Sequence, residues 1–250
     1  MNENLSDIKD KFQLAKRLIR QAGVYIRKNM DKDLIIEEKT CATDLVTDLD
    51  KSVQNLVVDE IKRAYPSDSF LAEEEDLKCR ISDPRVWVLD PIDGTANFVA
   101  QRDNFTILLS YYESGVGKFG LILDVMADNL YYGDGHKVFK NDQEIKTRIL
   151  EKSRSFIGVN SYMYRTNEFG LADLAEEFLG VRMYGGAGID YVNLIEGKLY
   201  GYFSNLCPWD YSAGTIILSA FGYETRPLDG SELNYCKRQK VMTVPKDFSY

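Results

Sequence analysis

The stretch Trp87-Val-Leu-Asp-Pro-Ile-Asp-Gly-Thr-Ala-Asn-Phe98 carries the strongest structural signal in this sequence. It reads as an apolar strand that ends at Asp90, because Pro91 cannot donate a ladder hydrogen bond. The carboxylates of Asp90 and Asp93 can converge on one point at this strand end. Gly94 lets the backbone approach an anion closely, and the exposed N–H groups of a helix start suit phosphate. The stretch therefore predicts a site at which carboxylates and an anion meet.

The composition is that of an ordinary globular protein. The chain has 250 residues, of which 44% are hydrophobic and 28% charged. Acidic residues outnumber basic ones by 39 to 31, and the net charge of −8 argues against a nucleic-acid partner. No stretch approaches the about 18 consecutive apolar residues of a membrane span, and the first ten residues lack the apolar core of a signal peptide. We therefore expect a cytoplasmic protein without a membrane partner.

The scarcity of soft ligands limits the kind of metal that this chain can bind. His136 is the only histidine, and no two of the four cysteines form a C-x-x-C pair. The cysteines are typical of reduced cytosolic thiols rather than of a zinc site or a disulfide framework. A metal bound here is therefore expected to be a hard cation on oxygen ligands, Mg²⁺ or Mn²⁺.

The spacing of apolar residues predicts two halves with different rhythms. Residues 1–145 read as an α+β half with an antiparallel sheet, and residues 146–250 as an α/β half, packed together as one compact unit. Turns are expected at 133–135 and 141–142. The expected helices cover the first thirty residues, 50–64, 168–179, 188–196 and 209–222, and the expected strands cover 86–89, 105–111, 119–123, 130–132, 156–159 and 199–204.

Four stretches, in the right order, resemble the motifs of the inositol monophosphatase superfamily of Mg²⁺-dependent, often lithium-sensitive phosphatases. Together they extend over most of the chain. The resemblance implies the layered αβαβα sandwich of the inositol monophosphatase and fructose-1,6-bisphosphatase type, and a homodimer. The four stretches are Leu45-Val-Thr-Asp-Leu-Asp50, Phe70-Leu-Ala-Glu73-Glu74, the stretch from Trp87 to Phe98, and Trp209-Asp210-Tyr-Ser-Ala-Gly214.

The resemblance also implies a set of metal ligands. Glu73, Asp90 and the carbonyl group of Ile92 are expected to hold one Mg²⁺. Asp90, Asp93 and Asp210 are expected to hold a second ion, with Asp90 as the bridge, and Glu73 is expected to touch a third. Mn²⁺ is the expected substitute for Mg²⁺.

The catalytic and substrate-binding residues are likewise implied by the resemblance. Thr95, hydrogen-bonded to Asp50, is expected to orient and activate the attacking water, with Glu73 as a further catalytic residue. Lys39 lies where members of the family often carry a lysine near the site. The residues expected to bind the substrate are Asp93, Gly94, Thr95, Gly185, Gly186, Ala187 and Asp210.

Several positions depart from the pattern of the inositol-directed members. These usually carry a glutamate six residues before the Trp of the last motif, where this chain has Phe203. Gly186 replaces a small polar residue, and Ala96 and Ala100 replace the usual Thr and His. Phe203 and the neighbouring Tyr202 either form an aromatic wall for a base or belong to the core. The acidic residues 74–76 are expected to lie in a solvated loop.

The predicted function is Mg²⁺-dependent hydrolysis of a small phosphate monoester, similar to that of an inositol monophosphatase. The alternative substrates are NADP, a nucleotide 3′-phosphate and fructose 1,6-bisphosphate. A non-catalytic regulatory binding protein is an alternative of another class. Loss of a metal ligand would mark that alternative, and none of the expected ligands is missing.

Overall fold

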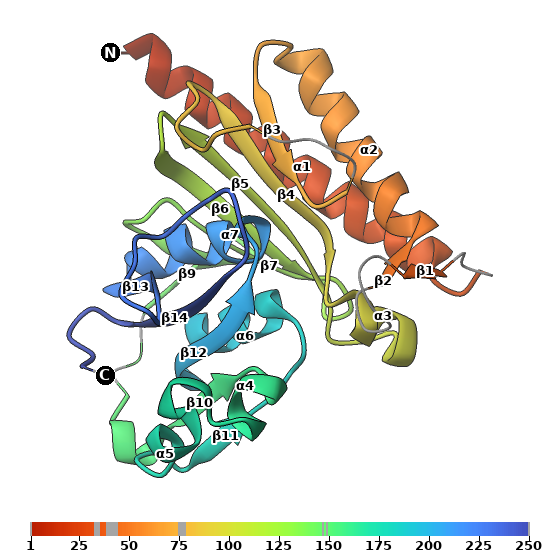
Figure 1. The fold of residues 1–250 in the computed structure, drawn as a ribbon. Helices are drawn as coiled ribbons and strands as arrows, with labels where there is room; N and C mark the ends of the chain where they lie inside the picture. Colours follow the sequence, from red (N-terminus) through yellow and green to blue (C-terminus); the bar gives the residue numbers. More distant parts are fainter. Residues whose placement is uncertain are drawn as a thin grey trace.

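The fold is described from a computed structural model of the chain. The structure describes residues 2–32, 36–38, 45–74, 79–146, 148 and 150–249. Helices and sheets alternate in layers, which confirms the αβαβα sandwich implied by the resemblance (Figure 1). Among the described helices, none combines the length and the apolar character needed to cross a bilayer.

The outer helical layer consists of α1 (Asn2–Asn29) and α2 (Asp48–Ala64), which cover one face of the larger sheet (Figure 1). Apolar residues at three- and four-residue steps predict both helices, because such residues share one face of a helix. α2 begins with a capping box, in which Thr47 and Asp50 each accept a hydrogen bond from the other's backbone N–H group. The box fixes Asp50 as a buried carboxylate at the start of α2.

The larger sheet is a meander of seven strands in sequence order. β3 and β4 run parallel, and every later pair is antiparallel, as the sequence pattern predicts. The turns expected at 133–135 and 141–142 follow β7 and separate β8 from β9. The strands are β3 (Ser69–Ala72), β4 (Val86–Asp93), β5 (Thr106–Glu113), β6 (Val116–Asp124), β7 (Asn129–Gly133), β8 (Val138–Lys140) and β9 (Gln143–Ile145).

Three short elements complete the side of the fold where the site forms. β1 (Ile36–Glu38) and β2 (Leu45–Thr47) form an antiparallel pair that leads into α2. α3 (Thr95–Gln101) follows β4 after the single residue Gly94. The chain therefore turns from a buried strand into a helix directly after Asp93.

A middle helical layer separates the two sheets. It consists of α6 (Ala187–Ile195) and α7 (Pro208–Ser219), both almost wholly buried. One hydrophobic cluster joins these helices to the second face of the larger sheet and to one face of the smaller sheet. Burial on both sides accounts for the apolar sequence of both helices.

The smaller sheet has five strands in the order β11-β10-β12-β14-β13. β10 runs parallel to β11 and β12, whereas β14 is antiparallel to both of its neighbours. The larger sheet ends with β9 at Ile145, and the smaller sheet begins with β10 at Phe156. The strands are β10 (Phe156–Val159), β11 (Gly180–Arg182), β12 (Leu199–Leu206), β13 (Tyr223–Pro227) and β14 (Gln239–Pro245).

The helix predicted over 168–179 is wrong in its extent. The chain has a 3₁₀ turn, Glu168–Gly170, followed by a single short helix α5 (Leu171–Ala175). Phe169 and Gly170 have φ values of 54° and 70°, in the left-handed region, and they interrupt the helix at its start. With α4 (Ser161–Arg165), α5 covers the outer face of the smaller sheet.

Strand alternation in β12 places the two members of its aromatic pair on opposite faces of the smaller sheet. Successive side chains of a strand point to opposite faces of the sheet. Tyr202 accordingly belongs to the cluster around α6 and α7, whereas Phe203 packs in the outer cluster beside Phe248. Phe203 is fully buried there and is a core residue rather than an aromatic wall for a ligand.

Substitution Phe203→Ala should therefore act on stability. Removing a fully buried ring is expected to lower the free energy of unfolding by about 3–5 kcal/mol, measured by urea titration. Tyr162→Ala is the matched control, because this aromatic side chain lies 56% exposed on α4 and should change stability by less than about 0.5 kcal/mol. Equal effects of the two substitutions would contradict the placement of Phe203.

Candidate active site

Three buried carboxylates meet where the larger sheet faces the middle helical layer. Asp90 and Asp93 come from the end of β4, and Asp210 comes from the first turn of α7. Each offers one oxygen atom, and these atoms all lie within 4.8 Å of one another. The three residues are only 2%, 6% and 9% exposed. The two carboxylates predicted to converge at the strand end do so, and the last sequence motif supplies the third.

An irregularity in β4 brings its two carboxylates together. Residues three apart in a regular strand point to opposite faces of the sheet. The register between β4 and β5 shifts between Asp90 and Asp93, as at a β-bulge, around Pro91. The Ile92 N–H group donates to Asp90 Oδ1 at 3.1 Å instead of to a neighbouring strand. The predicted strand end at Asp90 is therefore wrong, because β4 continues to Asp93, which pairs with Thr106. Pro91 interrupts the ladder without ending the strand, and this irregularity lets both carboxylates face the same site.

Asp93 is held by the N-terminus of α6. Its two carboxylate oxygens accept hydrogen bonds from the N–H groups of Ala187 at 2.9 Å and Gly188 at 2.7 Å. The Thr106 hydroxyl donates a third at 3.0 Å. Burial raises the pKa of Asp93 to about 6 although these three hydrogen bonds lower it. A Cβ atom on Gly188 would lie 1.9 Å from the Thr106 hydroxyl, so this helix start requires glycine.

Asp210 occupies the third position of α7, and its carboxylate accepts a hydrogen bond from the Cys207 N–H group at 2.7 Å. Pro208 opens the helix, where its missing N–H group is not needed. Burial raises the pKa of Asp210 to about 8, and the charges of Asp93 and Glu73 act in the same direction. The carboxylates therefore disfavour one another's charge.

Glu73 lies near Asp90, outside the group of three carboxylates formed by Asp90, Asp93 and Asp210. It follows β3, and its N–H group donates to the Leu89 carbonyl at 3.3 Å. Burial raises the pKa of Asp90 well above its usual range, and the charge of Glu73 and a hydrogen bond between the two side chains add to this. Of all described His, Cys, Asp and Glu residues, only Asp90, Asp93 and Asp210 form a group of at least three that could hold a metal.

The prediction of a solvated loop after Glu73 is wrong for Glu74. This residue is only 5% exposed, and its backbone N–H and carbonyl groups both pair with the side chain of Gln54 on α2. Residues 75 and 76 lie outside the described residues, as does Lys39. The amide of Gln54 thus ties the segment that carries Glu73 to α2.

Thr95 and Asp50 are brought together as predicted. The Thr95 hydroxyl lies 3.3 Å from Asp50 Oδ1 and 2.9 Å from the Ile92 carbonyl oxygen, and it can donate to either. The Asp50 carboxylate also accepts hydrogen bonds from the backbone and the hydroxyl of Thr47. Burial raises the pKa of Asp50 to about 7 against the effect of those two bonds.

Gly94, in the turn between β4 and α3, and Gly186, before α6, pack closely against each other's segments. Gly94 has a φ of 87°, in the left-handed region, and a Cβ atom there would lie 3.2 Å from the Asn104 carbonyl oxygen. A Cβ atom on Gly186 would lie 3.1 Å from Asp93 Oδ2. A side chain at Gly186 would therefore be tightly packed against this carboxylate.

Asn97 joins this turn to the glycine-rich segment before α6, a role that the sequence motif alone did not reveal. Its side-chain amide donates to the Asn104 carbonyl at 3.0 Å and to the Tyr184 carbonyl at 2.7 Å. A Cβ atom on Gly185 would lie 3.0 Å from the Asn97 side chain. Asn97 therefore positions the predicted substrate loop against the turn between β4 and α3.

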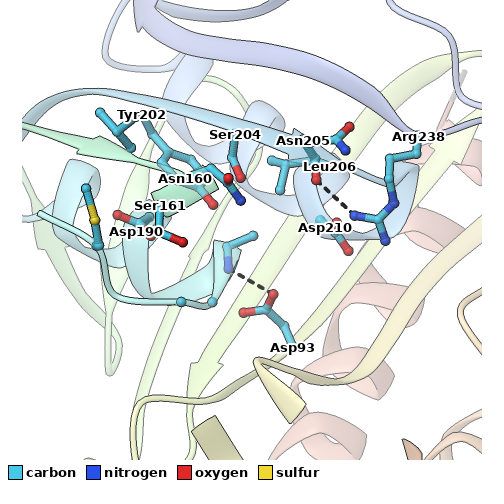
Figure 2. Close-up of a pocket in the computed structure, with 15 residues that line it drawn as sticks. Asp93, Asn160, Ser161, Asp190, Tyr202, Ser204, Asn205, Leu206, Asp210 and Arg238 are labelled. Atoms are coloured by element: carbon cyan, nitrogen blue, oxygen red, sulfur yellow. Dashed lines mark hydrogen bonds between the residues drawn. The ribbon is translucent and has the colours of Figure 1, made fainter. Parts of the chain in front are cut away.

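A cavity of about 600 Å³ adjoins the three carboxylates and shares Asp93 and Asp210 with them (Figure 2). The predicted loop residues Gly185, Gly186 and Ala187 line it, whereas Gly94 and Thr95 do not, and Phe203 faces the other side of its strand. Sequence reasoning missed the polar residues of its wall, which lie at the ends of β10 and β12, on α6 and before β14. They are Asn160, Ser161, Asp190, Ser204, Asn205 and Arg238.

Known proteins resemble this chain over nearly all of its length. The sequence model of the inositol monophosphatase family matches residues 8–247. The inositol-1-monophosphatase of Bacillus subtilis (strain 168) is 33% identical over 240 residues, which cover 92% of this chain and 90% of that protein. Inositol monophosphatase-II from Staphylococcus aureus MSSA476 is 30% identical with a TM-score of 0.83, and the match covers 95% of this chain and 89% of that one.

Further structures extend the comparison. Staphylococcal IMPase-II has also been solved with 2′AMP bound and with inositol monophosphate bound. An IMPase/NADP phosphatase complexed with Mg²⁺ and phosphate shares the fold at 24% identity and a TM-score of 0.87, over 96% of this chain and 92% of that one. Because the family motifs, the layered fold and the match over residues 8–247 agree, this chain belongs to the inositol monophosphatase family and is a phosphatase, a phosphoric monoester hydrolase.

Proposed function

We propose that this phosphatase hydrolyses a small phosphate monoester with Mg²⁺ and water. The observation that supports this proposal most strongly is the group of three buried carboxylates, Asp90, Asp93 and Asp210, of which Asp93 and Asp210 line a polar cavity. The pair of Thr95 and Asp50 lies next to the same turn. A metal site, a hydroxyl group for orienting water and a cavity for a leaving group are what such a hydrolysis requires.

The residues of the site fit Mg²⁺. Carboxylate and carbonyl oxygens are the ligands that this hard cation prefers. Without a cation, burial and mutual repulsion raise the pKa values of Asp90, Asp93 and Asp210, so a divalent ion would relieve an unfavourable arrangement. The related phosphatase complexed with Mg²⁺ and phosphate supports the same choice.

The proposed ligand sets are those that the family resemblance implies. Glu73, Asp90 and the Ile92 carbonyl would hold one ion, and Asp90, Asp93 and Asp210 would hold a second. Glu73 contributes to a third, and Mn²⁺ substitutes for Mg²⁺. When bound, the ions supply positive charge against the phosphate and lower the pKa of the water that attacks it.

In the proposed mechanism, Thr95 orients the attacking water. Its hydroxyl group has a single hydrogen atom. When this atom points to Asp50 Oδ1, the Thr95 oxygen is free to accept a hydrogen bond from the water. Asp50, held by Thr47, then stabilises that orientation. The N–H groups of Gly94 and Thr95 bind phosphate oxygens, and the leaving group lies in the cavity beyond Gly185, Gly186 and Ala187.

Inositol monophosphate is the substrate that we test first. The curated relative from B. subtilis is an inositol-1-monophosphatase, and staphylococcal IMPase-II has been solved with inositol monophosphate bound. Phe203 faces the core and provides no stacking surface in the cavity, whereas Tyr202 lines the cavity wall. Cytoplasmic location, the homodimer and sensitivity to lithium stay predictions.

The direct test is phosphate release from a panel of esters with Mg²⁺, with and without lithium. The panel contains inositol 1-phosphate, fructose 1,6-bisphosphate, NADP, adenosine 3′,5′-bisphosphate and β-glycerophosphate. The proposal predicts Mg²⁺-dependent release from at least one of them. Folded protein that releases no phosphate from any of them in the presence of Mg²⁺ would contradict it and favour the regulatory alternative.

Thr95→Ala should slow turnover without weakening metal binding. Positioned proton transfer typically contributes about 10²–10⁴-fold to a rate, so we expect a loss of kcat in this range. Thr95→Ser keeps the hydroxyl group and should retain most of the activity. The increase in unfolding temperature on adding Mg²⁺ should be the same in both variants and in the wild type. Equal activity of Thr95→Ala and Thr95→Ser would exclude the proposed role of the hydroxyl.

Removal of the metal should make stability depend on pH. The pKa values of Asp50, Asp93 and Asp210 rise from 3.8 to about 7, 6 and 8 in the folded protein. The folded state therefore binds more protons than the unfolded state between about pH 4 and 8, and its stability falls as pH rises through this window. We expect the unfolding temperature of EDTA-treated protein to fall over that window, and Mg²⁺ to restore it most at the upper end.

The control for this experiment is Asp210→Asn, which removes the group whose pKa is about 8. The metal-free variant should unfold at a higher temperature than the metal-free wild type near pH 8. Its unfolding temperature should also fall less as pH rises. A metal-free wild type that gains stability as pH rises would contradict the claim that burial and mutual repulsion raise the pKa values of these carboxylates.

A further inference from the structure

Asp190 is a buried carboxyl group that the proposed metal chemistry does not use. It lies in the first turn of α6, is 2% exposed, and lines the cavity. Its Oδ1 atom is buried and has no hydrogen-bond partner among the described residues. It is also absent from the three-carboxylate group formed by Asp90, Asp93 and Asp210. A buried polar atom without a partner is costly, and the described residues leave this carboxyl group unsatisfied at the edge of the cavity.

The surrounding fold makes room for this carboxyl group. A Cβ atom on Gly158 of β10 would lie 2.4 Å from Asp190 Oδ1, so only glycine leaves the space that Asp190 occupies. By contrast, the buried carboxylates of Asp50, Asp93 and Asp210 all accept hydrogen bonds from backbone N–H groups. Of these four residues, only Asp190 has an oxygen that is both buried and without a hydrogen-bond partner among the described residues.

The neighbouring wall of the cavity is polar and largely uncharged. Asn160, Ser161 and Ser204 line it, and Figure 2 shows Asn160 and Ser161 on the same side of the cavity as Asp190. The Asn160 side-chain oxygen accepts the N–H groups of Tyr162 and Met163, which directs its NH₂ group away from that turn. Hydroxyl and amide groups beside a carboxyl group match the hydrogen-bonding pattern of an alcohol with several hydroxyl groups.

We propose that Asp190 is a specificity-determining residue that hydrogen-bonds a hydroxyl group of the leaving alcohol. The cavity then favours phosphate esters whose alcohol carries hydroxyl groups near the ester, as a cyclitol or a ribose does. This inference rests on the proposed function. No residue between Leu199 and Pro208 is acidic, so β12 offers no carboxylate for this purpose, and α6 supplies one instead.

A purely structural role for Asp190 makes a different prediction. A carboxylate in the first turn of a helix is favourable because of the helix dipole. Loss of that effect would lower stability and would reduce the hydrolysis of all esters alike. Loss of a hydrogen bond to the substrate would act only on esters that carry the hydroxyl group.

The test compares two esters of one ring size, inositol 1-phosphate and cyclohexyl phosphate, which lacks the hydroxyl groups. A third ester, 2′-AMP, presents ribose hydroxyl groups. The protein variants are Asp190→Ala, Asp190→Asn and the control Asn193→Ala. Asn193 is a buried residue of α6 whose side chain donates to the Ile189 carbonyl, and it does not line the cavity. The values of kcat/KM and the unfolding temperature are measured for each protein.

The wild type should prefer a hydroxylated ester to cyclohexyl phosphate. Asp190→Ala should reduce that preference by about 10- to 100-fold, as expected for one lost hydrogen bond to a buried polar group. Asp190→Asn keeps an acceptor oxygen and should retain part of the preference, whereas Asn193→Ala should retain all of it. The wild type could instead prefer 2′-AMP to inositol 1-phosphate, and the Asp190 variants could lose that preference. In that case the hydroxyl group that contacts Asp190 would be one of the ribose.

Two outcomes would overturn the inference while leaving the phosphatase function intact. One is a wild type that hydrolyses the hydroxylated esters and cyclohexyl phosphate equally well. The other is an Asp190→Ala variant that keeps the preference or loses activity on all three esters together with a lower unfolding temperature. A folded wild type that releases no phosphate from any ester would instead contradict the proposed function itself.

Discussion

The burial of several negative charges at one point is the constraint on which the rest of this structure depends. Asp90, Asp93 and Asp210 bring their carboxylates within 4.8 Å of one another in a region almost closed to solvent. Such an arrangement is unfavourable in a protein without a compensating charge. The strand irregularity at Pro91, the glycines of the adjoining turns and the polar cavity all serve to maintain it.

The N-termini of three helices partly compensate the buried negative charge. The Asp50 carboxylate caps α2, the Asp93 carboxylate accepts the first N–H groups of α6, and the Asp210 carboxylate accepts an N–H group at the start of α7. The positive end of a helix favours a nearby carboxylate, so the layered fold itself supports the site. Because α6 and α7 lie between the two sheets, these same contacts tie both sheets to the site.

Much of this arrangement could be predicted because it depends on local sequence. The proline of the stretch from Trp87 to Phe98 marks an irregularity in β4, although the strand continues past it to Asp93, and amphipathic spacing marks the long helices. Asp190 could not be predicted, because its lack of a partner depends on how β10 and β12 pack around α6. The extent of α5 was missed because the left-handed backbone of Phe169 does not show in the apolar pattern. Phe203 needed the strand register before its direction was defined.

The measurement that tests this account most directly is the number of protons released when Mg²⁺ binds. Calorimetric titration near pH 7, in two buffers with different ionisation enthalpies, gives that number. Because burial and mutual repulsion raise the pKa values of the carboxylates, the account predicts Mg²⁺ binding with a net release of protons. Absence of binding, or binding without proton release, would contradict the claim that the buried carboxylates form the metal site.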